Sequence, residues 1–286
     1  MINDRKVGLA PLTLVEVSPP ELVGLAESVG FDFVGLRVSP SVPGETVYPM
    51  LPGSPMLKET VRRLLDSPVG VVDIDVFALH PDTKASDFLL ALESGAELGA
   101  THCAVVDGGC ERSHFTETFG ELAEVAQSFG ITPVVEPITY RGVNSIRAAA
   151  EVSAVHDNTA MLIDSLHFFR FGGKFEELAQ LPASKLPFFQ LCDAPLEPPT
   201  EIPDGLVAPM NQSTGGSPLQ FEARAMRLLP GTGELPLEKL VRAMPDGLPI
   251  SVETPLVIEI QRFGVQAFAE RVFKAIKHFL VGMESE

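Results

Sequence analysis

The chain is poor in cysteine and in basic residues, and each shortage excludes a class of protein. Its 286 residues include three cysteines, Cys103, Cys110 and Cys192. So sparse and odd a set predicts free thiols in a reducing cytoplasm and argues against a disulfide framework. Lysine and arginine number 21 against 38 aspartates and glutamates, a formal net charge of −17. Because nucleic-acid affinity comes largely from basic side chains that neutralise phosphates, we expect no nucleic-acid partner.

Long apolar runs are also missing. No stretch approaches the roughly 18 consecutive apolar residues that a membrane-spanning helix needs. The N-terminal segment MINDRKVGLAPLTLVEV is charged from the start, and its apolar stretch is short and interrupted. This pattern is typical of a first strand and not of a signal peptide. We therefore expect a cytoplasmic protein that has no membrane partner.

What the chain does contain is an ordinary globular composition arranged in a repeating pattern. Hydrophobic residues make up 45% and charged residues 21%, which suffices for a sizeable core. Helical stretches end at Gly30, Gly99 and Gly130, and each is followed by a run of consecutive apolar residues. Glycine just past a helix end adopts the left-handed conformation that terminates the helix. Consecutive apolar residues predict strands of a parallel sheet that helices cover on both faces.

Followed along the chain, this pattern predicts eight strands, at residues 6–15, 32–38, 70–79, 101–107, 131–138, 159–165, 186–192 and 248–253. Helices are expected between and after them, at residues 20–29, 56–66, 85–98, 115–129, 143–156, 174–181, 236–244 and 264–281. Such alternation predicts an α/β fold with a single domain over residues 1–286, a (β/α)₈ barrel, with a doubly wound open sheet as the competitor. Neither a G-x-G-x-x-G nor a G-x-x-x-x-G-K-[ST] motif is present, so the nucleotide-binding open sheets lose their main support.

Two long irregular segments interrupt the pattern. Residues 39–55 (loop A) follow the second expected strand, and residues 194–223 (loop B) follow the seventh. Both are rich in proline or glycine, and loops of this length in a compact domain are usually lids or binding loops, or else disordered. Each leaves the carboxyl end of a strand, the face on which barrels carry their active sites.

Polar side chains stand at the ends of the last four expected strands. They are Glu136 in PVVEP, Asp164 in MLIDS, Gln190 and Asp193 in PFFQLCD, and Glu253 in ISVETP. One such carboxylate alone is more often a helix cap or a loop hydrogen bond. Four successive strand ends would converge at one rim of a closed barrel, where unpaired polar groups are costly to bury.

Three converging carboxylates would repel one another unless a cation lay among them. Carboxylate and amide oxygens suit a hard divalent ion, so Mn²⁺ or Mg²⁺ is favoured and Zn²⁺ or Co²⁺ stays open. We therefore expect one divalent cation bound by Glu136, Asp164, Gln190 and Glu253. Asp193 is expected to hold a neighbouring ligand or loop in place.

Together these motifs resemble the xylose isomerase-like TIM barrels, a superfamily of sugar epimerases, isomerases and dehydratases. The resemblance spans nearly the whole chain, and its motifs are specific as a set and weak singly. It implies that Glu136 and Glu253 both bind the metal and act as the acid/base pair. It also implies that the D-x-x-H motif supplies a metal ligand, Asp164, and a substrate-binding imidazole, His167. An arginine before a P-G-x-G segment contacts substrate oxygens in this family, and Arg227 in MRLLPGTGELPL matches it.

One position departs from the family pattern. The seventh-strand ligand is commonly histidine, and here Gln190 takes its place, a neutral and weaker ligand that puts the activity in doubt. The endonuclease IV branch of the superfamily is excluded more firmly. It uses a histidine-rich zinc cluster, and of the six histidines here only His167 falls in a matching motif.

Three functions follow as alternatives. The leading one is an isomerase or epimerase of a small polyhydroxy carbonyl compound, in which the two glutamates transfer a proton through an enediolate. The second is a dehydratase of the inosose or dehydroshikimate type on the same metal site. The third is a non-catalytic barrel whose site has decayed. Without a visible cluster of basic residues, we expect an unphosphorylated small-molecule substrate, and the sequence leaves a homo-oligomer open.

Overall fold

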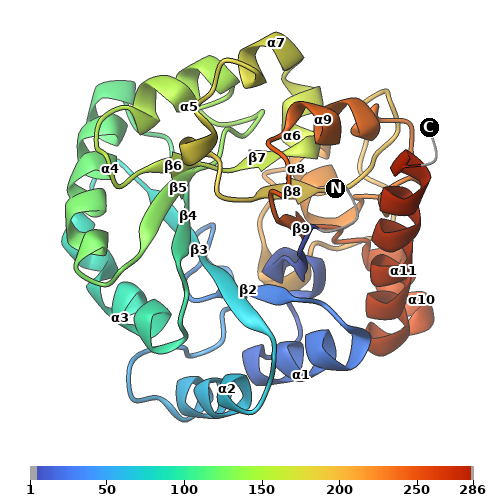
Figure 1. The fold of residues 1–286 in the computed structure, drawn as a ribbon, viewed down its shortest axis with the longest axis horizontal. Coiled ribbons are helices and arrows are strands. Elements are labelled where there is room, and N and C mark those ends of the chain that lie inside the picture. The colour runs from blue at the N-terminus through green and yellow to red at the C-terminus, as the bar shows by residue number, and fades with distance from the viewer. Residues whose placement is uncertain (1–4, 285–286) are drawn as a thin grey trace.

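The computed structural model describes residues 5–284, and at its centre lies one sheet of parallel strands (Figure 1). The strands are β1 (Val7–Leu9), β2 (Phe33–Arg37), β3 (Gly70–Leu79), β4 (His102–Asp107), β5 (Thr132–Val135), β6 (Ala160–Met161), β7 (Ile163–Asp164), β8 (Phe189–Leu191) and β9 (Ile250–Val252). Their order across the sheet is β6-β5-β4-β3-β2-β1-β9-β8-β7. Neighbours in space are thus neighbours in sequence, apart from the β1–β9 pair, which joins the two ends of the chain.

The two outermost strands of this order are halves of one barrel strand. β6 and β7 are separated only by Leu162. Met161 of β6 pairs with Val135 of β5, and Asp164 of β7 pairs with Gln190 of β8. The sheet therefore closes at this point, with eight strand positions around the ring. The predicted (β/α)₈ barrel is confirmed.

Helices form an outer ring around the barrel, and α8 (Pro218–Ala225) lies inside this ring, beside β8 in this view (Figure 1). The other helices are α1 (Pro19–Val29), α2 (Pro55–Leu65), α3 (Leu89–Glu97), α4 (Arg112–Gln127), α5 (Ile146–Ser153), α6 (Ser165–Arg170), α7 (Phe175–Leu178), α9 (Leu237–Ala243), α10 (Val257–Phe263) and α11 (Val265–Glu284). Short 3₁₀ helices are η2 (Pro11–Leu14), η3 (Ala85–Phe88), η4 (Ala183–Lys185) and η5 (Pro209–Asn211). Among residues 5–284, no helix combines the length and the apolar character required to cross a bilayer.

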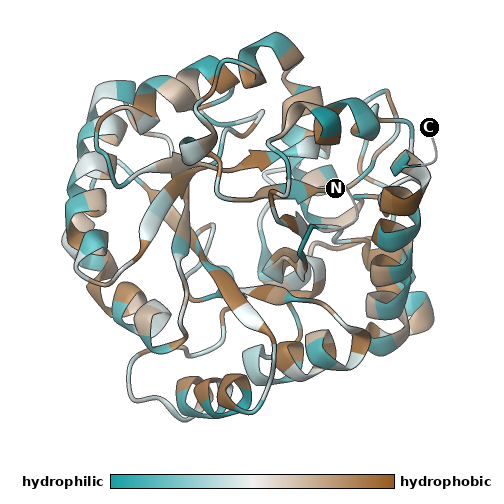
Figure 2. Ribbon diagram, in the orientation of Figure 1, coloured by the Kyte–Doolittle hydropathy of each residue, from teal (hydrophilic) through white to brown (hydrophobic). Residues whose placement is uncertain are grey.

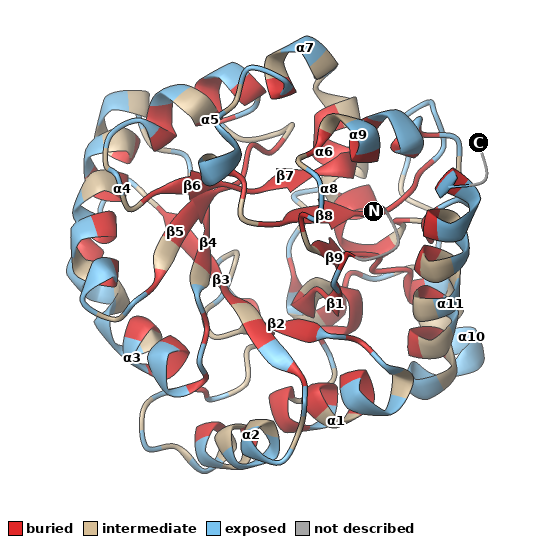
Figure 3. Ribbon diagram, in the orientation of Figure 1, coloured by how far each residue is buried: buried red, intermediate tan, exposed pale blue. Residues whose placement is uncertain are grey.

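The hydrophobic core has two parts, because successive residues of a strand face opposite sides of the barrel wall. In β4, Cys103 and Val105 belong to the main cluster that packs against the helices. Ala104 and Val106 belong to small separate clusters inside the barrel. The strands are accordingly hydrophobic and buried almost throughout, whereas the helices carry hydrophilic, exposed residues on their outer faces (Figures 2 and 3).

Some element boundaries differ from the predictions. The first strand, expected over residues 6–15, ends at Leu9, and the chain turns into η2 at Pro11. Proline has no amide hydrogen to donate to a neighbouring strand, so the strand ends before Pro11. Three helices were not expected: α6, α8, which forms the end of loop B, and α10. The single-domain prediction over 1–286 includes terminal residues outside the described part.

Loops A and B lie against each other, and one buried carboxylate joins them. Glu45 of loop A accepts hydrogen bonds from the Ser41 hydroxyl (2.6 Å) and from Gln212 Nε2 of loop B (2.8 Å). Its Oε1 also lies 2.5 Å from the Arg37 guanidinium at the end of β2. A backbone bond from Thr46 N to Met210 O, 2.8 Å long, runs beside this contact. Glu45 therefore ties both long loops to the barrel wall.

We expect Glu45→Gln to loosen both loops. Each bond to a charged group contributes about 1.5–3 kcal/mol, so amide exchange at residues 41–46 and 208–213 should speed up about tenfold or more. Hydrogen exchange followed by mass spectrometry measures this. Glu151→Gln, which removes an exposed carboxylate paired with Arg147, is the control and should change neither loop.

The same link should weaken in acid. Burial raises the pKa of Glu45, but the Arg37 charge and the hydrogen bonds from Ser41 and Gln212 outweigh burial and place the pKa below its ordinary value of 4.5. A depressed pKa stabilises the fold above the ordinary value, and this contribution is lost as the pH falls through the folded pKa. Loop protection in the unmodified protein, corrected for the intrinsic pH dependence of amide exchange, that stays constant from pH 6 down to pH 2 would contradict the assignment.

Candidate active site

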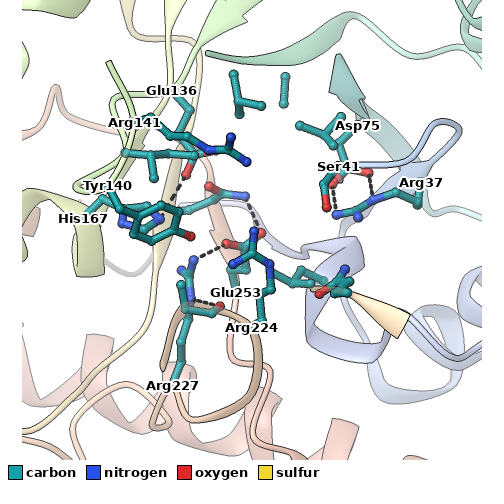
Figure 4. A pocket seen from close by; sticks show the side chains of 18 residues that line it. Arg37, Ser41, Asp75, Glu136, Tyr140, Arg141, His167, Arg224, Arg227 and Glu253 are labelled. Carbon is teal, nitrogen blue, oxygen red and sulfur yellow. Dashed lines mark hydrogen bonds and ion pairs between the residues drawn. The ribbon is translucent and has the colours of Figure 1, made fainter. Parts of the chain in front are cut away.

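A pocket opens at the carboxyl ends of the strands, between the barrel mouth and the two long loops (Figure 4). It encloses about 570 Å³ of space when its open mouth is included. Ala104 and Val106 of β4 are among the side chains lining it, and loop A contributes Ser41 and loop B Gln212. The small interior residues of β4 leave the space that the pocket occupies.

The four strand-end residues expected to bind a metal lie together at this mouth. Glu136 follows β5, Asp164 ends β7, Gln190 lies in β8 and Glu253 follows β9. All four are at most 8% exposed. Glu136, Gln190 and Glu253 line the pocket, while Asp164 lies just behind it. Gln190 Nε2 donates a hydrogen bond to Glu253 Oε1 over 2.8 Å.

The Asp164 carboxylate makes two contacts, and one of them caps a helix. Its Oδ1 accepts a hydrogen bond from the His167 backbone N–H (3.0 Å), so it caps the first turn of α6. Its Oδ2 lies 2.5 Å from Arg227 Nη1. The cap fixes the start of α6, and with it the position of the His167 imidazole.

Arg227 lies deeper than expected for a residue that only contacts substrate. Its side chain is 2% exposed, and its guanidinium bridges Asp164 and Glu253, with Nη2 2.9 Å from Glu253 Oε2. It also lines the pocket, so its predicted contact with substrate stays a prediction. The structure adds a second role, because Arg227 is the counter-ion of two of the predicted metal ligands.

Asp193 orients the segment that carries Arg227, in line with its expected supporting role. Its carboxylate accepts hydrogen bonds from the backbone N–H groups of Gly231 (3.1 Å), Gly233 (2.9 Å) and Leu235 (3.1 Å). A Cβ on Gly233 would lie 2.5 Å from Asp193 Oδ1. The glycine of the P-G-x-G segment is therefore required by this close approach.

Burial controls the charge of the titratable groups. It raises the pKa of Glu253 to about 7, with Arg227 opposing and Asp164 reinforcing the shift. The pKa of Glu136 is raised well above its usual range by burial and then by the charge of Glu253. Burial also lowers the pKa of His167 to about 3, so its imidazole is neutral near pH 7. The His167 Nε2 lies 3.9 Å from Glu136 Oε1.

These residues fit a hard divalent cation. Gln190 Oε1 is buried and has no hydrogen-bond partner among residues 5–284, so one amide oxygen is free to bind a cation. Glu136, Asp164 and His167 each offer a ligand atom within 4.8 Å of the others. Carboxylate and amide oxygens are donors that such ions prefer. The Glu253 carboxylate, predicted as a further ligand, pairs with Arg227 and is not a member of this group. Arg227 already neutralises part of this cluster, so a bound cation would share or replace its contacts.

Several pocket residues were missed from the sequence. Tyr140 and Arg141 follow Glu136 in the loop after β5, and Arg224 lies on α8, one helical turn before Arg227. The only local signal for Arg224 was its place three residues before Arg227 in RAMR, although α8 ends at Ala225 and Arg227 lies beyond it. Arg170, three residues after His167, forms a buried ion pair with Glu222 over 2.6 Å.

Solved structures with the same fold include proteins of several activities. The IolI protein, in a structure with a bound zinc atom, shares 18% identity over 98% of each chain, with a TM-score of 0.72. The probable 3-DHS dehydratase AsbF from Bacillus anthracis shares 12% identity over 95% of this chain and 98% of its own, with a TM-score of 0.65. D-allulose 3-epimerase from Methylomonas sp., in complex with D-allulose, shares 12% identity over 96% of each chain, with a TM-score of 0.64.

At these identities the likeness shows a shared fold. Among curated protein sequences, none matches this chain significantly. The family model described as xylose isomerase-like TIM barrel matches residues 23–270, most of the barrel and the whole predicted metal site. The chain therefore belongs to the xylose isomerase-like TIM barrel family.

Proposed function

We propose that the protein is a divalent-metal-dependent isomerase or epimerase of a small polyhydroxy carbonyl compound. The observation that carries this proposal is the pair of buried glutamates at one pocket, Glu136 and Glu253, beside Asp164 and Gln190. The Glu253 charge is the largest electrostatic contribution to the raised pKa of Glu136, so the two carboxylates act on each other directly. Two carboxylates with raised pKa values at one pocket suit general acid and base roles.

The residues of the chain would divide the chemistry as follows. Glu136, Asp164, Gln190 and Glu253 would hold the cation, which when bound acidifies the C–H between a carbonyl and a hydroxyl group. One glutamate removes that proton, the electron pair moves into the carbonyl to form an enediolate, and the other glutamate returns a proton. Neutral His167 donates a hydrogen bond to a substrate oxygen. Structural similarity to an IolI structure with a bound zinc atom supports the metal, and similarity to an epimerase in complex with D-allulose supports this class of reaction.

A dehydratase is the second candidate, favoured by Tyr140. In that reaction the same proton is removed, and a β-hydroxyl then leaves as water after accepting a proton from an acid. The Tyr140 phenol lines the pocket and packs edge-on against His167. Burial raises the pKa of Tyr140, so it keeps its proton at neutral pH and is a suitable donor. The likeness to a probable dehydratase supports this alternative.

Proton exchange in heavy water tests the proposal. The Mn²⁺-loaded protein is incubated in D₂O with a panel of keto-sugars and inososes, and the products are followed by NMR and mass spectrometry. Deuterium incorporation without loss of water is expected for the isomerase. Net loss of one water would identify the dehydratase, and absence of both reactions would indicate a decayed site. Location in the cytoplasm and assembly into a homo-oligomer stay predictions.

The ligand assignment makes a separate prediction about metal affinity. Asp164 would contribute an anion and Gln190 only a dipole, so Asp164→Ala should weaken Mn²⁺ binding more than Gln190→Ala. We expect losses of at least roughly 100-fold and tenfold, because removal of groups that only orient metal ligands already costs about 10–100-fold. Titration calorimetry of the two variants measures both. A Gln190→Ala protein that has lost its metal, beside an Asp164→Ala protein that keeps it, would show the assignment to be wrong.

A further inference from the structure

Two of the four arginines that line the pocket have no carboxylate partner. Arg37 and Arg227 each pair with two carboxylates. In the part of the chain from residue 5 to 284, no ion pair is formed by Arg141 or Arg224. Figure 4 shows Arg141 reaching into the cavity from the loop after β5, with Arg224 across from it on α8.

Neither arginine is neutralised by a carboxylate of the described residues, and Arg224 is held in place by uncharged groups. Arg224 is 5% exposed and donates hydrogen bonds to Gln220 O (3.1 Å) and Gln220 Oε1 (3.2 Å). Its guanidinium also lies 5.7 Å from the centre of the Tyr140 ring. The Nε of Arg141 is buried without a hydrogen-bond partner. A buried cation without a counter-ion is costly, so the free protein lacks a compensating group at this place.

The charges around the pocket indicate what that group is. Its arginines and their ion-pair partners, together with Glu136, amount to five carboxylates and four guanidiniums. A bound cation would favour the ionised forms of Glu136 and Glu253 in spite of their raised pKa values. With all groups ionised, the protein charges sum to one negative charge, and a divalent cation would turn this sum into one positive charge. A ligand with a single negative charge would make the site neutral, whereas a phosphate dianion would overshoot.

We infer that the substrate carries a carboxylate, and that Arg141 and Arg224, which line the same pocket as three of the predicted metal ligands, bind it. Guanidinium groups match the planar carboxylate and bind it through paired hydrogen bonds. This inference rests on the proposed function and narrows its substrate from polyhydroxy carbonyl compounds to their acids. It refines the sequence prediction of an unphosphorylated substrate, because the basic cluster forms only when the chain folds.

Two matched series of sugars test the inference. The first is D-fructose, D-fructuronate and D-fructose 6-phosphate, and the second is D-glucose, D-glucuronate and D-glucose 6-phosphate. Within a series the members differ only at C6, which is neutral, a carboxylate or a phosphate. Calorimetry with the Mn²⁺-loaded protein gives the affinity of each. The acid of at least one series should bind about 10–100-fold tighter than its neutral partner, the value of one charged hydrogen bond.

Variants separate the arginines from direct binding of the acid to the metal. Arg141→Gln, in a half-buried loop, and Arg224→Gln should each remove most of the preference for the acid, with unchanged Mn²⁺ affinity. Arg147→Gln, an exposed arginine outside the pocket, is the control and should keep the preference. Thermal unfolding shows whether the Arg224→Gln protein is folded. If that protein is unfolded, the test uses Arg141→Gln alone.

The outcomes are distinct. The inference is overturned if neutral sugars bind as well as acids, if phosphates bind tighter, if no sugar binds, or if the preference survives in Arg141→Gln. Deuterium exchange on the same samples tests the proposed reaction separately from the inferred carboxylate site. Exchange without a preference for acids leaves the reaction standing and removes the carboxylate site. If Arg141→Gln abolishes a preference for acids and no deuterium exchange is seen, the carboxylate site stands and the proposed reaction is removed.

Discussion

Glu253→Gln should lower the rate of proton exchange between substrate and solvent by about 10²–10⁴-fold, the usual contribution of a general acid or base. The glutamine amide keeps the size of the side chain and an oxygen for the metal, but it cannot take up a proton. Much of the Mn²⁺ affinity should therefore remain while turnover is lost. Exchange is followed by NMR in D₂O with the best substrate of the panel, and metal content by calorimetry.

His167→Ala is the comparison for this variant. His167 orients a substrate oxygen and transfers no proton on our proposal, so its loss should cost about 10²–10³-fold, the scale of one electrostatic donor. Both proteins should retain the cation. Exchange at the full rate in Glu253→Gln would show that the acid/base pair lies elsewhere, and the proposed mechanism would then fall.

Arg227→Met should unfold at a lower temperature than the unmodified protein, by roughly 6–20 °C in EDTA. Its removal leaves Asp164 and Glu253 buried beside Glu136 without a counter-ion. Breaking a buried pair in this way costs about 3–5 kcal/mol, and each kcal/mol shifts the Tm by about 2–4 °C in a protein of this size. Adding Mn²⁺ should restore much of the loss, because the cation takes over the neutralising role of the guanidinium.

The measurement is the rise in Tm on adding Mn²⁺, which should be larger in Arg227→Met than in the unmodified protein. Arg170→Met is the matched control, since Arg170 forms an equally buried pair with Glu222 outside the carboxylate cluster. It should lose stability and gain no additional response to the metal. An equal response to Mn²⁺ in Arg227→Met and the unmodified protein would contradict the idea that guanidinium and cation compete for the same oxygens.

The sequence by itself determined the barrel and the rim on which the site lies. Apolar runs, helix-ending glycines and polar strand ends are local signals, and they suffice because a closed parallel barrel brings all carboxyl ends of its strands together. Glu136, Asp164, Gln190 and Glu253 could therefore be placed at one mouth. Their roles as metal ligands and as acid and base came from resemblance and stay proposals.

Only the tertiary structure decided how the charges at that mouth are paired. Arg227 bridges Asp164 and Glu253, whereas Arg141 and Arg224 face the pocket without a carboxylate. No local pattern predicts such pairing, because the partners come from segments far apart in the chain. An ion pair depends on distances of a few ångströms between side-chain ends, which are set only when loop B folds over the barrel as α8. The sequence thus determined where the site lies, and the folded chain determined which of its charges are paired within the described residues.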